Sequence, residues 1–195
     1  MIQQEKHAIF FDLQGTLGGE PLGDILDFTF YEGAKQALSL AAQSGFLCFI
    51  ITNQSHIAKG LLTMEEFESN MKQLQQEIEQ EDGKIEQVYC CPHLRVQGCN
   101  CKKPSPLFIK SAMDRYNLKP ENCCVIGDIG QSDMLMAQNA RTKGILVKTG
   151  NGLASLTVNR QTWSKYTPDY IANDVFDAVR WLTHNQPFEK DRYLQ

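Results

Sequence analysis

Short runs of hydrophobic residues alternate along the chain with longer segments in which apolar residues recur at helical spacing. This alternation is typical of βαβ units, in which parallel strands form a sheet and helices cover it. The pattern predicts strands at Ala8–Phe11, Phe46–Thr52, Ile85–Cys90, Cys123–Ile126, Gly144–Val147 and near Tyr170–Ile171. It predicts helices at Gly33–Gln43, Met64–Gln80, Pro106–Tyr116, Ser132–Asn139 and Val175–Leu182.

A chain of 195 residues has the length of one compact domain, and no repeat, low-complexity stretch or linker divides it. We therefore predict a single α/β domain over residues 1–195. The chain has 19 Lys and Arg against 23 Asp and Glu, a net charge of −4. It lacks the basic excess with which proteins neutralise nucleic-acid phosphates, so we expect no nucleic-acid partner.

Signals for membranes or export are weak. The densest apolar run, Phe46 to Ile51, is far shorter than the ~18 residues of a membrane span. The opening MIQQEKHAIFFDLQG holds too short an apolar stretch for a secretory signal. We therefore expect a cytoplasmic protein without a membrane partner, and nothing in the sequence requires more than a monomer.

Polar side chains follow several of the predicted strands, at the edge where parallel sheets bind ligands. These residues, at strand ends or in the loops after them, are Asp12, Gln14, Thr52, Asn53, Lys102, Lys103, Asp128 and Asp133. Each one alone is more often a loop residue or a solvated charge. Their occurrence in order, strand after strand, favours a shared functional site.

The residue types in this set suit phosphoryl transfer, which needs a nucleophile, positive charge and a metal ion. Asp12 can supply a carboxylate nucleophile. Lys103 can pair with phosphate oxygens, and Thr52 can donate a hydrogen bond to them. Asp128 suits Mg²⁺, while Asp133 can bind the metal or orient its waters.

Four segments, FFDLQGTL, ITNQS, CKKP and VIGDIGQSD, resemble in this order the four motifs of the haloacid dehalogenase-like phosphatases. TNQSHIAKG, CPH…CNCKKP and ILVKTG are similar, more narrowly, to the branch that contains heptose-bisphosphate phosphatase and the histidinol-phosphate phosphatase domain. The resemblance covers nearly the whole chain. It implies a three-layer, Rossmann-like fold without a large cap domain.

The resemblance also implies roles for individual residues. Asp12 is the nucleophile that becomes an aspartyl phosphate, and Thr52 and Lys103 bind the phosphoryl group. Mg²⁺ is held by Asp12, the backbone carbonyl of Gln14, and Asp128. These expectations agree with the chemistry of the residues themselves.

Three cysteines and one histidine form a second candidate metal site. Cys91, His93, Cys99 and Cys101 offer three sulfurs and one imidazole, a closed ligand set suited to structural zinc. The alternative is a loop with incidental cysteines, but the Cys-Pro-His segment before Cys-x-Cys favours zinc. Zinc would pin a loop of low apolar content and thereby position Lys103.

Gln14 departs from the family pattern, which has at this position the aspartate that protonates the leaving alcohol and activates water. A carboxamide has no titrating proton near neutral pH and can do neither, which typically costs ~10²–10⁴-fold in rate.

His56 stands where the related phosphatases usually have Gly, and is either a surface residue or a substitute acid. Lys102 replaces the usual Arg, which weakens any bidentate phosphate contact; Lys102 and Asn53 remain candidate substrate-binding residues.

The sequence therefore predicts a Mg²⁺-dependent phosphomonoester hydrolase with structural zinc, acting on a small phosphorylated metabolite. Gln14 makes this enzyme slow, or suited to substrates with good leaving groups. The alternative is a catalytically weak protein that binds a phosphorylated ligand in the same pocket. Nothing in the sequence identifies the substrate.

Overall fold

The structure is a computed structural model that describes residues 5–185. Within these residues six strands form one sheet, in which every neighbouring pair is parallel and the order is β3-β2-β1-β4-β5-β6. The strands are β1 His7–Phe11, β2 Phe46–Asn53, β3 Gln87–Cys91, β4 Cys123–Gly127, β5 Lys143–Val147 and β6 Tyr170–Ala172. The helices are α1 Ala34–Gln43, α2 Ser55–Ala58, α3 Met64–Glu79, α4 Leu107–Tyr116, α5 Leu135–Ala140, α6 Gly152–Leu156 and α7 Val175–Asn185.

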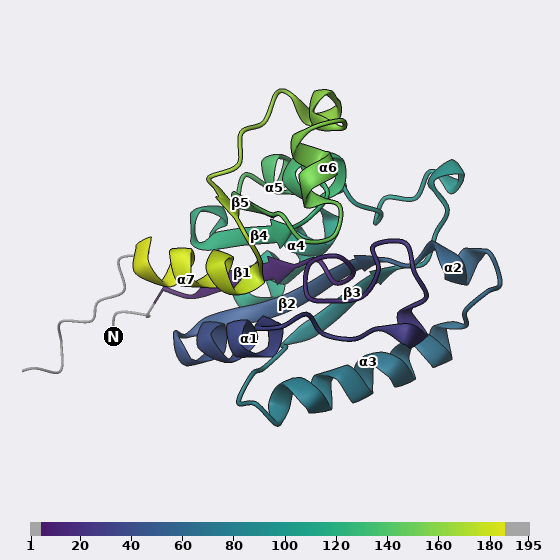
Figure 1. Cartoon of the computed structure of the whole chain (residues 1–195), viewed down its shortest axis with the longest axis horizontal. Helices are drawn as coiled ribbons and strands as arrows, with labels where there is room; N and C mark the ends of the chain where they lie inside the picture. The colour runs from purple at the N-terminus through teal and green to yellow at the C-terminus, as the bar shows by residue number, and fades with distance from the viewer. Residues whose placement is uncertain (1–4, 186–195) are drawn as a thin grey trace, which may run out of the picture.

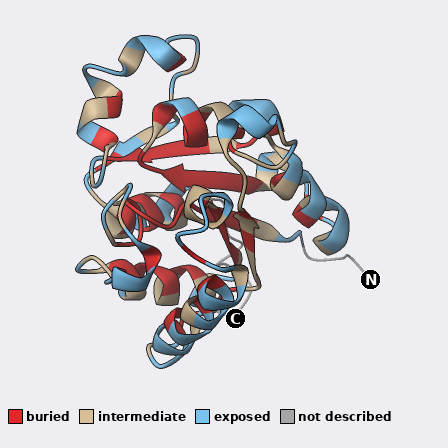
Figure 2. Cartoon of the chain, turned by 90° about the vertical axis from the view of Figure 1, so that its right-hand side faces the viewer, coloured by how far each residue is buried: buried red, intermediate tan, exposed pale blue. Residues whose placement is uncertain are grey.

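Side chains that alternate along each strand point to opposite faces of the sheet, and each face has its own hydrophobic core. Ile9 and Phe11 of β1 belong to a core shared with α1, α3 and α7, whereas Ala8 and Phe10 belong to one shared with α4 and α5. The sheet is thus the middle of three layers (Figure 1). Figure 2 shows its strands buried beneath helices whose outer sides are exposed. The predicted three-layer, Rossmann-like α/β fold is confirmed.

One sheet organises the described part of the chain, which therefore forms a single domain. Between β1 and α1 the chain forms a loop with one 3₁₀ turn, Ile25–Asp27, which agrees with the expectation of no large cap. The predicted span of 1–195 reaches beyond the described residues and stays a prediction. Of the helices in residues 5–185, none has the length and apolarity to cross a membrane.

Most differences from the predicted elements lie at their ends. The predicted helix Ser132–Asn139 begins instead as a π-helical turn, Gly130–Met134, and continues as α5. Residues Ile85 and Glu86 precede β3 rather than belonging to it. Helices α2 and α6, of four and five residues, are too short to leave a periodic pattern in the sequence.

The carboxyl ends of β1, β2 and β4 lie side by side, because β1 is hydrogen-bonded to both other strands. The segments that follow these strands therefore meet at one edge of the sheet. The long loop after β3 returns to this edge, where Lys103 N donates to Asn53 Oδ1 at 3.1 Å. The fold thus brings together residues that are far apart in the sequence.

Candidate active site

Asp12 lies at the centre of this edge. It directly follows β1, its side chain is buried, and its main-chain N donates to Ile126 O at 2.9 Å. One carboxylate oxygen, Oδ1, forms an ion pair with Lys103 Nζ, and the other, Oδ2, accepts from Thr16 Oγ1 at 3.2 Å. Lys103 Nζ also lies 2.7 Å from Asp133 Oδ1. The lysine therefore sits between two carboxylates.

Burial controls the ionisation of this group of residues. Burial, opposed by the charge of Lys103 and aided by that of Asp133, raises the pKa of Asp12 to about 6. For Lys103 burial lowers the pKa, but the charges of Asp12 and Asp133 outweigh it and raise the pKa above its ordinary value. Lys103 is therefore a permanent cation beside the Asp12 carboxylate.

Three carboxylates form a cluster with the chemistry of a magnesium site. Ligand oxygens of Asp12, Asp128 and Asp133 all lie within 4.8 Å of one another. Asp128 is fully buried, and burial first, then Asp12 and Asp133, raise its pKa well above the ordinary value. Its Oδ2 accepts from Asn151 N at 2.7 Å, but its Oδ1 has no hydrogen-bond partner. A buried, unpartnered carboxylate oxygen in an acidic cluster fits a hard cation such as Mg²⁺.

Two glycines allow the backbone to close around Asp128. A Cβ atom on Gly15 would lie 2.3 Å from Asp128 Oδ2, and one on Gly150 would lie 2.4 Å from it. Both glycines also have positive φ, +87° and +53°. Side chains at these positions would fill the space beside the carboxylate, so the sequence keeps this space open with glycine.

Residues beyond the cluster hold Asp128 and Asp133 in place. Ser155 Oγ donates to Asp128 O at 2.8 Å and accepts from Gly130 N at 3.1 Å. Trp163 Nε1 donates to Ser155 O at 2.9 Å, which ties this serine to a buried aromatic ring. The π-helical turn lets Ile129 N donate to Asp133 Oδ2 at 2.9 Å. The backbone at Asp128 and the carboxylate of Asp133 are therefore held by hydrogen bonds within the protein.

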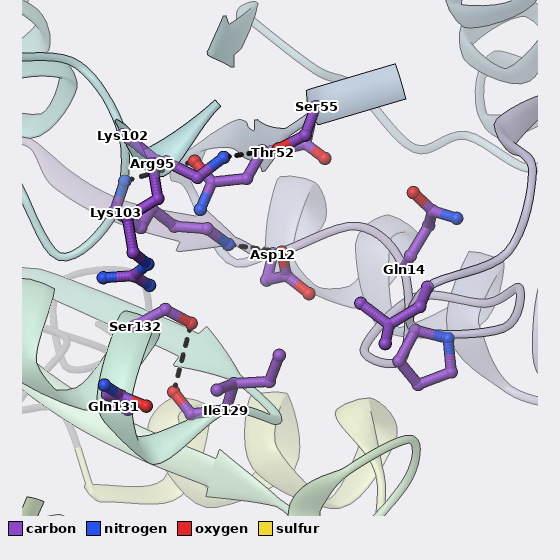
Figure 3. A pocket seen from close by; sticks show the side chains of 13 residues that line it. Asp12, Gln14, Thr52, Ser55, Arg95, Lys102, Lys103, Ile129, Gln131 and Ser132 are labelled. Atoms are coloured by element: carbon purple, nitrogen blue, oxygen red, sulfur yellow. Dashed lines mark hydrogen bonds and ion pairs between the residues drawn. The ribbon is translucent and has the colours of Figure 1, made fainter. Parts of the chain in front are cut away.

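A cavity of about 230 Å³ opens above Asp12. Its lining consists of Asp12, Gln14, Pro21, Leu22, Thr52, Asn53, Ser55, Arg95, Lys102, Lys103, Ile129, Gln131 and Ser132. Figure 3 shows Lys102, Lys103 and Arg95 on one side of this cavity and Gln14 on the other, with Asp12 between them. The cavity therefore offers a carboxylate beside concentrated positive charge, an arrangement suited to a phosphorylated ligand.

The cavity brings together six of the residues expected from the sequence, namely Asp12, Gln14, Thr52, Asn53, Lys102 and Lys103. Asp128 and Asp133 are absent from its lining and lie beneath it, fully buried. His56, in α2, is not among the residues that line it. Lys102 Nζ donates to Ser55 Oγ at 2.7 Å and to His93 O at 2.9 Å, so it is tied to α2 and to the Cys/His loop.

Reasoning from the sequence did not single out some of the residues that line the cavity. Gln131 and Ser132 stand between the two aspartates of one motif, and that position was a usable signal. Arg95 lies inside the Cys/His loop, in a 3₁₀ turn, where its charge alone gave no reason to single it out. Pro21 and Leu22 belong to a loop whose path over the cavity only the tertiary structure defines.

The four Cys and His residues converge on a point. The three Sγ–Sγ distances among Cys91, Cys99 and Cys101 are 3.2, 3.6 and 3.6 Å, and His93 Nδ1 lies 3.8 and 3.3 Å from the sulfurs of Cys91 and Cys101. These lengths exceed a disulfide bond of about 2.05 Å. The Sγ–Sγ distances approach, from below, the edge of a tetrahedron around zinc, which is about 3.8 Å for Zn–S bonds of about 2.3 Å. The donor set fits structural zinc.

The chain is similar in sequence to known proteins along most of its length. A family model described as HAD-hydrolase-like matches residues 100–178. The D-glycero-beta-D-manno-heptose-1,7-bisphosphate 7-phosphatase of Haemophilus ducreyi is 31% identical over 187 residues, covering 91% of this chain and 98% of the relative. The enzyme of the same name from Escherichia coli K12 is 30% identical over 167 residues, covering 80% and 86%.

Solved structures show the same fold. A crystal structure of D,D-heptose 1,7-bisphosphate phosphatase from B. bronchiseptica, complexed with magnesium and phosphate, matches with a TM-score of 0.81 and 24% identity. The match covers 92% of this chain and 99% of that one. The corresponding enzyme from Burkholderia thailandensis matches with a TM-score of 0.68 and 17% identity, covering 91% and 98%. At these low sequence identities, the two matches show only that the fold is shared.

Proposed function

Because this chain belongs to the haloacid dehalogenase-like hydrolases and is a phosphatase, we propose that it cleaves a small phosphorylated sugar through attack by Asp12. The observation that carries the proposal is the environment of Asp12. Its buried carboxylate lines the cavity and is paired with Lys103. A carboxylate that is taken out of water and aimed by a cation is suited to act as a nucleophile.

The proposed reaction has two steps. A carboxylate oxygen of Asp12 attacks phosphorus, the bond from phosphorus to the sugar oxygen breaks, and an aspartyl phosphate forms. Water then attacks this phosphorus, releases inorganic phosphate and regenerates Asp12. Lys103 stays charged and binds the phosphoryl oxygens. Thr52 Oγ1 accepts from Gln54 Nε2 at 3.0 Å, which leaves its own hydrogen for a phosphoryl oxygen.

We propose that Asp12, Asp128 and the main-chain carbonyl of Gln14 hold Mg²⁺. The unpartnered Oδ1 of Asp128 supports this assignment. When bound, the ion supplies positive charge that neutralises the charge developing on the phosphoryl group. Asp133 has a different role in this proposal, because its Oδ1 is already paired with Lys103. It holds the lysine in place.

Zinc at Cys91, His93, Cys99 and Cys101 has a structural role in the proposal, because four protein ligands leave no open position for a substrate. The loop that carries them ends next to Lys102 and Lys103. Lys102 Nζ also donates to the main-chain oxygen of His93 at 2.9 Å. A Cys/His loop that zinc holds rigid therefore also holds Lys102, on the cationic side of the cavity, in place.

The cavity lacks a side chain that can serve as the general acid. Apart from Asp12, its described lining holds no carboxylic acid and no histidine. Gln14 takes no part in proton transfer, and His56 lies outside the lining. The leaving oxygen then takes its proton from water, so the enzyme is slow on alkyl esters and faster on esters with acidic leaving groups.

The positive side of the cavity supports a substrate with two phosphates. Arg95 and Lys102 line it in addition to Lys103, so two further cations are available for a second phosphate. The curated relatives are named for a heptose 1,7-bisphosphate. We therefore propose a sugar bisphosphate as the substrate class, with D-glycero-β-D-manno-heptose 1,7-bisphosphate the first compound to test.

A rapid-quench experiment with p-nitrophenyl phosphate and Mg²⁺ tests the proposal. We expect a burst of about one nitrophenolate per chain followed by a slower steady rate, because the first step needs no acid and the second lacks its base. Acid-quenched protein should carry phosphate on Asp12, and the Asp12→Asn variant should show neither burst nor turnover.

The alternative function, a protein that binds a phosphorylated sugar without cleaving it, is kept open by Gln14 alone. The same experiment separates the two functions. Binding of the sugar bisphosphate by calorimetry, with no burst and no phosphoprotein, would establish the alternative and reject the hydrolase.

A further inference from the structure

The side chain of Gln14 uses all of its strong hydrogen-bonding groups within the protein. Its Nε2 donates to Glu20 O at 3.1 Å and to Gly23 O at 3.0 Å, and its Oε1 accepts from Gln54 Nε2 at 2.9 Å. The two main-chain oxygens can only accept, so the amide orientation follows from its partners. Both amide hydrogens are therefore occupied by the protein.

The two hydrogen bonds that Gln14 donates bracket a turn that forms one wall of the cavity. Gly23 N donates to Glu20 O at 3.0 Å, and Pro21 and Leu22, between them, both line the cavity. Leu22 is 85% exposed, so packing in the core does not hold it. Gln14 reaches this turn from the loop after β1 and crosslinks its two ends.

We propose that Gln14 is a positioning residue that fixes the Glu20–Gly23 turn and thereby sets the wall that faces the leaving group. Only an amide can do this. A carboxylate at this position donates no hydrogen bond and would place negative charge against two carbonyl oxygens. Anchoring the turn and exchanging a proton with the substrate are therefore mutually exclusive roles for this side chain.

The anchor also extends to the phosphate side of the cavity. Gln54 Nε2 donates both to Gln14 Oε1 at 2.9 Å and to Thr52 Oγ1 at 3.0 Å. A chain of hydrogen bonds thus runs from the turn to the hydroxyl proposed to bind the phosphoryl group. The position of the wall relative to Thr52 is then part of substrate selection, and the role of the wall toward substrate rests on the proposed function.

Hydrogen exchange of the ligand-free protein tests the anchor without any reference to activity. Gln14→Met keeps the length of the side chain but removes both donors, and Gln14→Glu keeps the acceptor for Gln54 but removes both donors. In both variants we expect the amide of Gly23, which donates to Glu20 O within the turn, to exchange about tenfold faster, since one to two lost hydrogen bonds correspond to that factor. Gln43→Met, on the distant α1, is the matched control and should leave these rates unchanged.

Kinetics with p-nitrophenyl phosphate then separate a role of Gln14 in positioning the turn from a role in proton exchange with the substrate. A positioning role raises KM several-fold in both Gln14 variants, because the wall is misplaced in each. Unchanged exchange at Gly23 in both variants would overturn the inference, as would a Gln14→Glu variant with higher kcat and unchanged KM. Faster exchange in a protein without any phosphatase activity would leave the anchor established and reject the proposed function instead.

Discussion

The hydroxyl of Ser155 donates to the main-chain carbonyl of Asp128 at 2.8 Å and so joins α6 to the end of β4. The same hydroxyl accepts from Gly130 N at 3.1 Å, at the start of the π-helical turn. One buried side chain therefore determines how the backbone leaves β4 on its way from Asp128 to Asp133. A residue outside the cavity thus controls the geometry of the proposed metal ligand.

Replacing Ser155 with alanine should weaken Mg²⁺ binding. The change leaves the buried Gly130 N–H without its acceptor and Asp128 O without its donor, at a cost of about 1–3 kcal/mol for such buried groups. We expect Mg²⁺ affinity, measured by calorimetric titration, to fall about tenfold while the fold persists. Thr157→Ala removes an exposed hydroxyl that donates to Leu153 O and serves as the control. Equal affinity in Ser155→Ala and the wild type would contradict this role.

Replacing Asp128 with alanine should abolish Mg²⁺ binding and Mg²⁺-dependent turnover. The variant removes the carboxylate whose Oδ1 has no donor, and it leaves β4, which ends at Gly127, intact. Because burial raises the pKa of Asp128, its ionisation opposes folding at neutral pH, so its removal offsets part of the cost of losing the hydrogen bond from Asn151 N. Calorimetric titration and a thermal melt measure both effects, with the exposed Asp114→Ala as the control. Retained Mg²⁺ affinity would show that the metal site lies elsewhere.

Purified protein should contain about one zinc per chain, as a closed set of four ligands implies. Elemental analysis of protein prepared without chelators measures the content. Cys99→Ser should lower both the zinc content and the thermal stability, because it removes one of the four converging ligands. Cys90→Ser changes the neighbouring cysteine that lies outside the cluster and should keep the zinc. Zinc-free wild-type protein from such a preparation would refute the site.

The Mg²⁺-free protein should lose stability as pH rises from about 4 to above 6. Burial raises the pKa of Asp12 from 3.8 to about 6, so the folded state holds a proton that the unfolded state has already released. The folded state therefore binds more protons in this range, and its free energy of unfolding falls with rising pH.

Thermal melts without added Mg²⁺ and without chelator, at several pH values, measure this effect. Asp12→Asn cannot ionise there, so we expect the wild type to lose stability relative to it across this range. Mg²⁺ should restore the wild type most strongly at the upper end, where the carboxylates are ionised. Parallel curves for the two proteins would rule out the raised pKa of Asp12.

Much of the fold could be predicted from the sequence, because it follows from patterns of apolar residues within short segments. Alternation of short apolar runs with amphipathic segments reports directly on strands buried between two helical layers. The polar residues at the strand ends were also readable, since parallel strands place their carboxyl ends at one edge. Asp12, Thr52 and Asp128 were found in this way, and so was the Cys/His set from the spacing of its members.

The remaining features depend on contacts between segments far apart in the sequence. A motif could name Asp133 as metal-binding or orienting, but only the fold places its Oδ1 against Lys103. The absence of an acid at Gln14 was visible in the sequence, whereas its bonds to Glu20 O and Gly23 O were not. Main-chain carbonyls carry no sequence signal, because every residue has one. The sequence by itself therefore determined which chemical groups meet at the sheet edge, and tertiary structure decided which partner each group has.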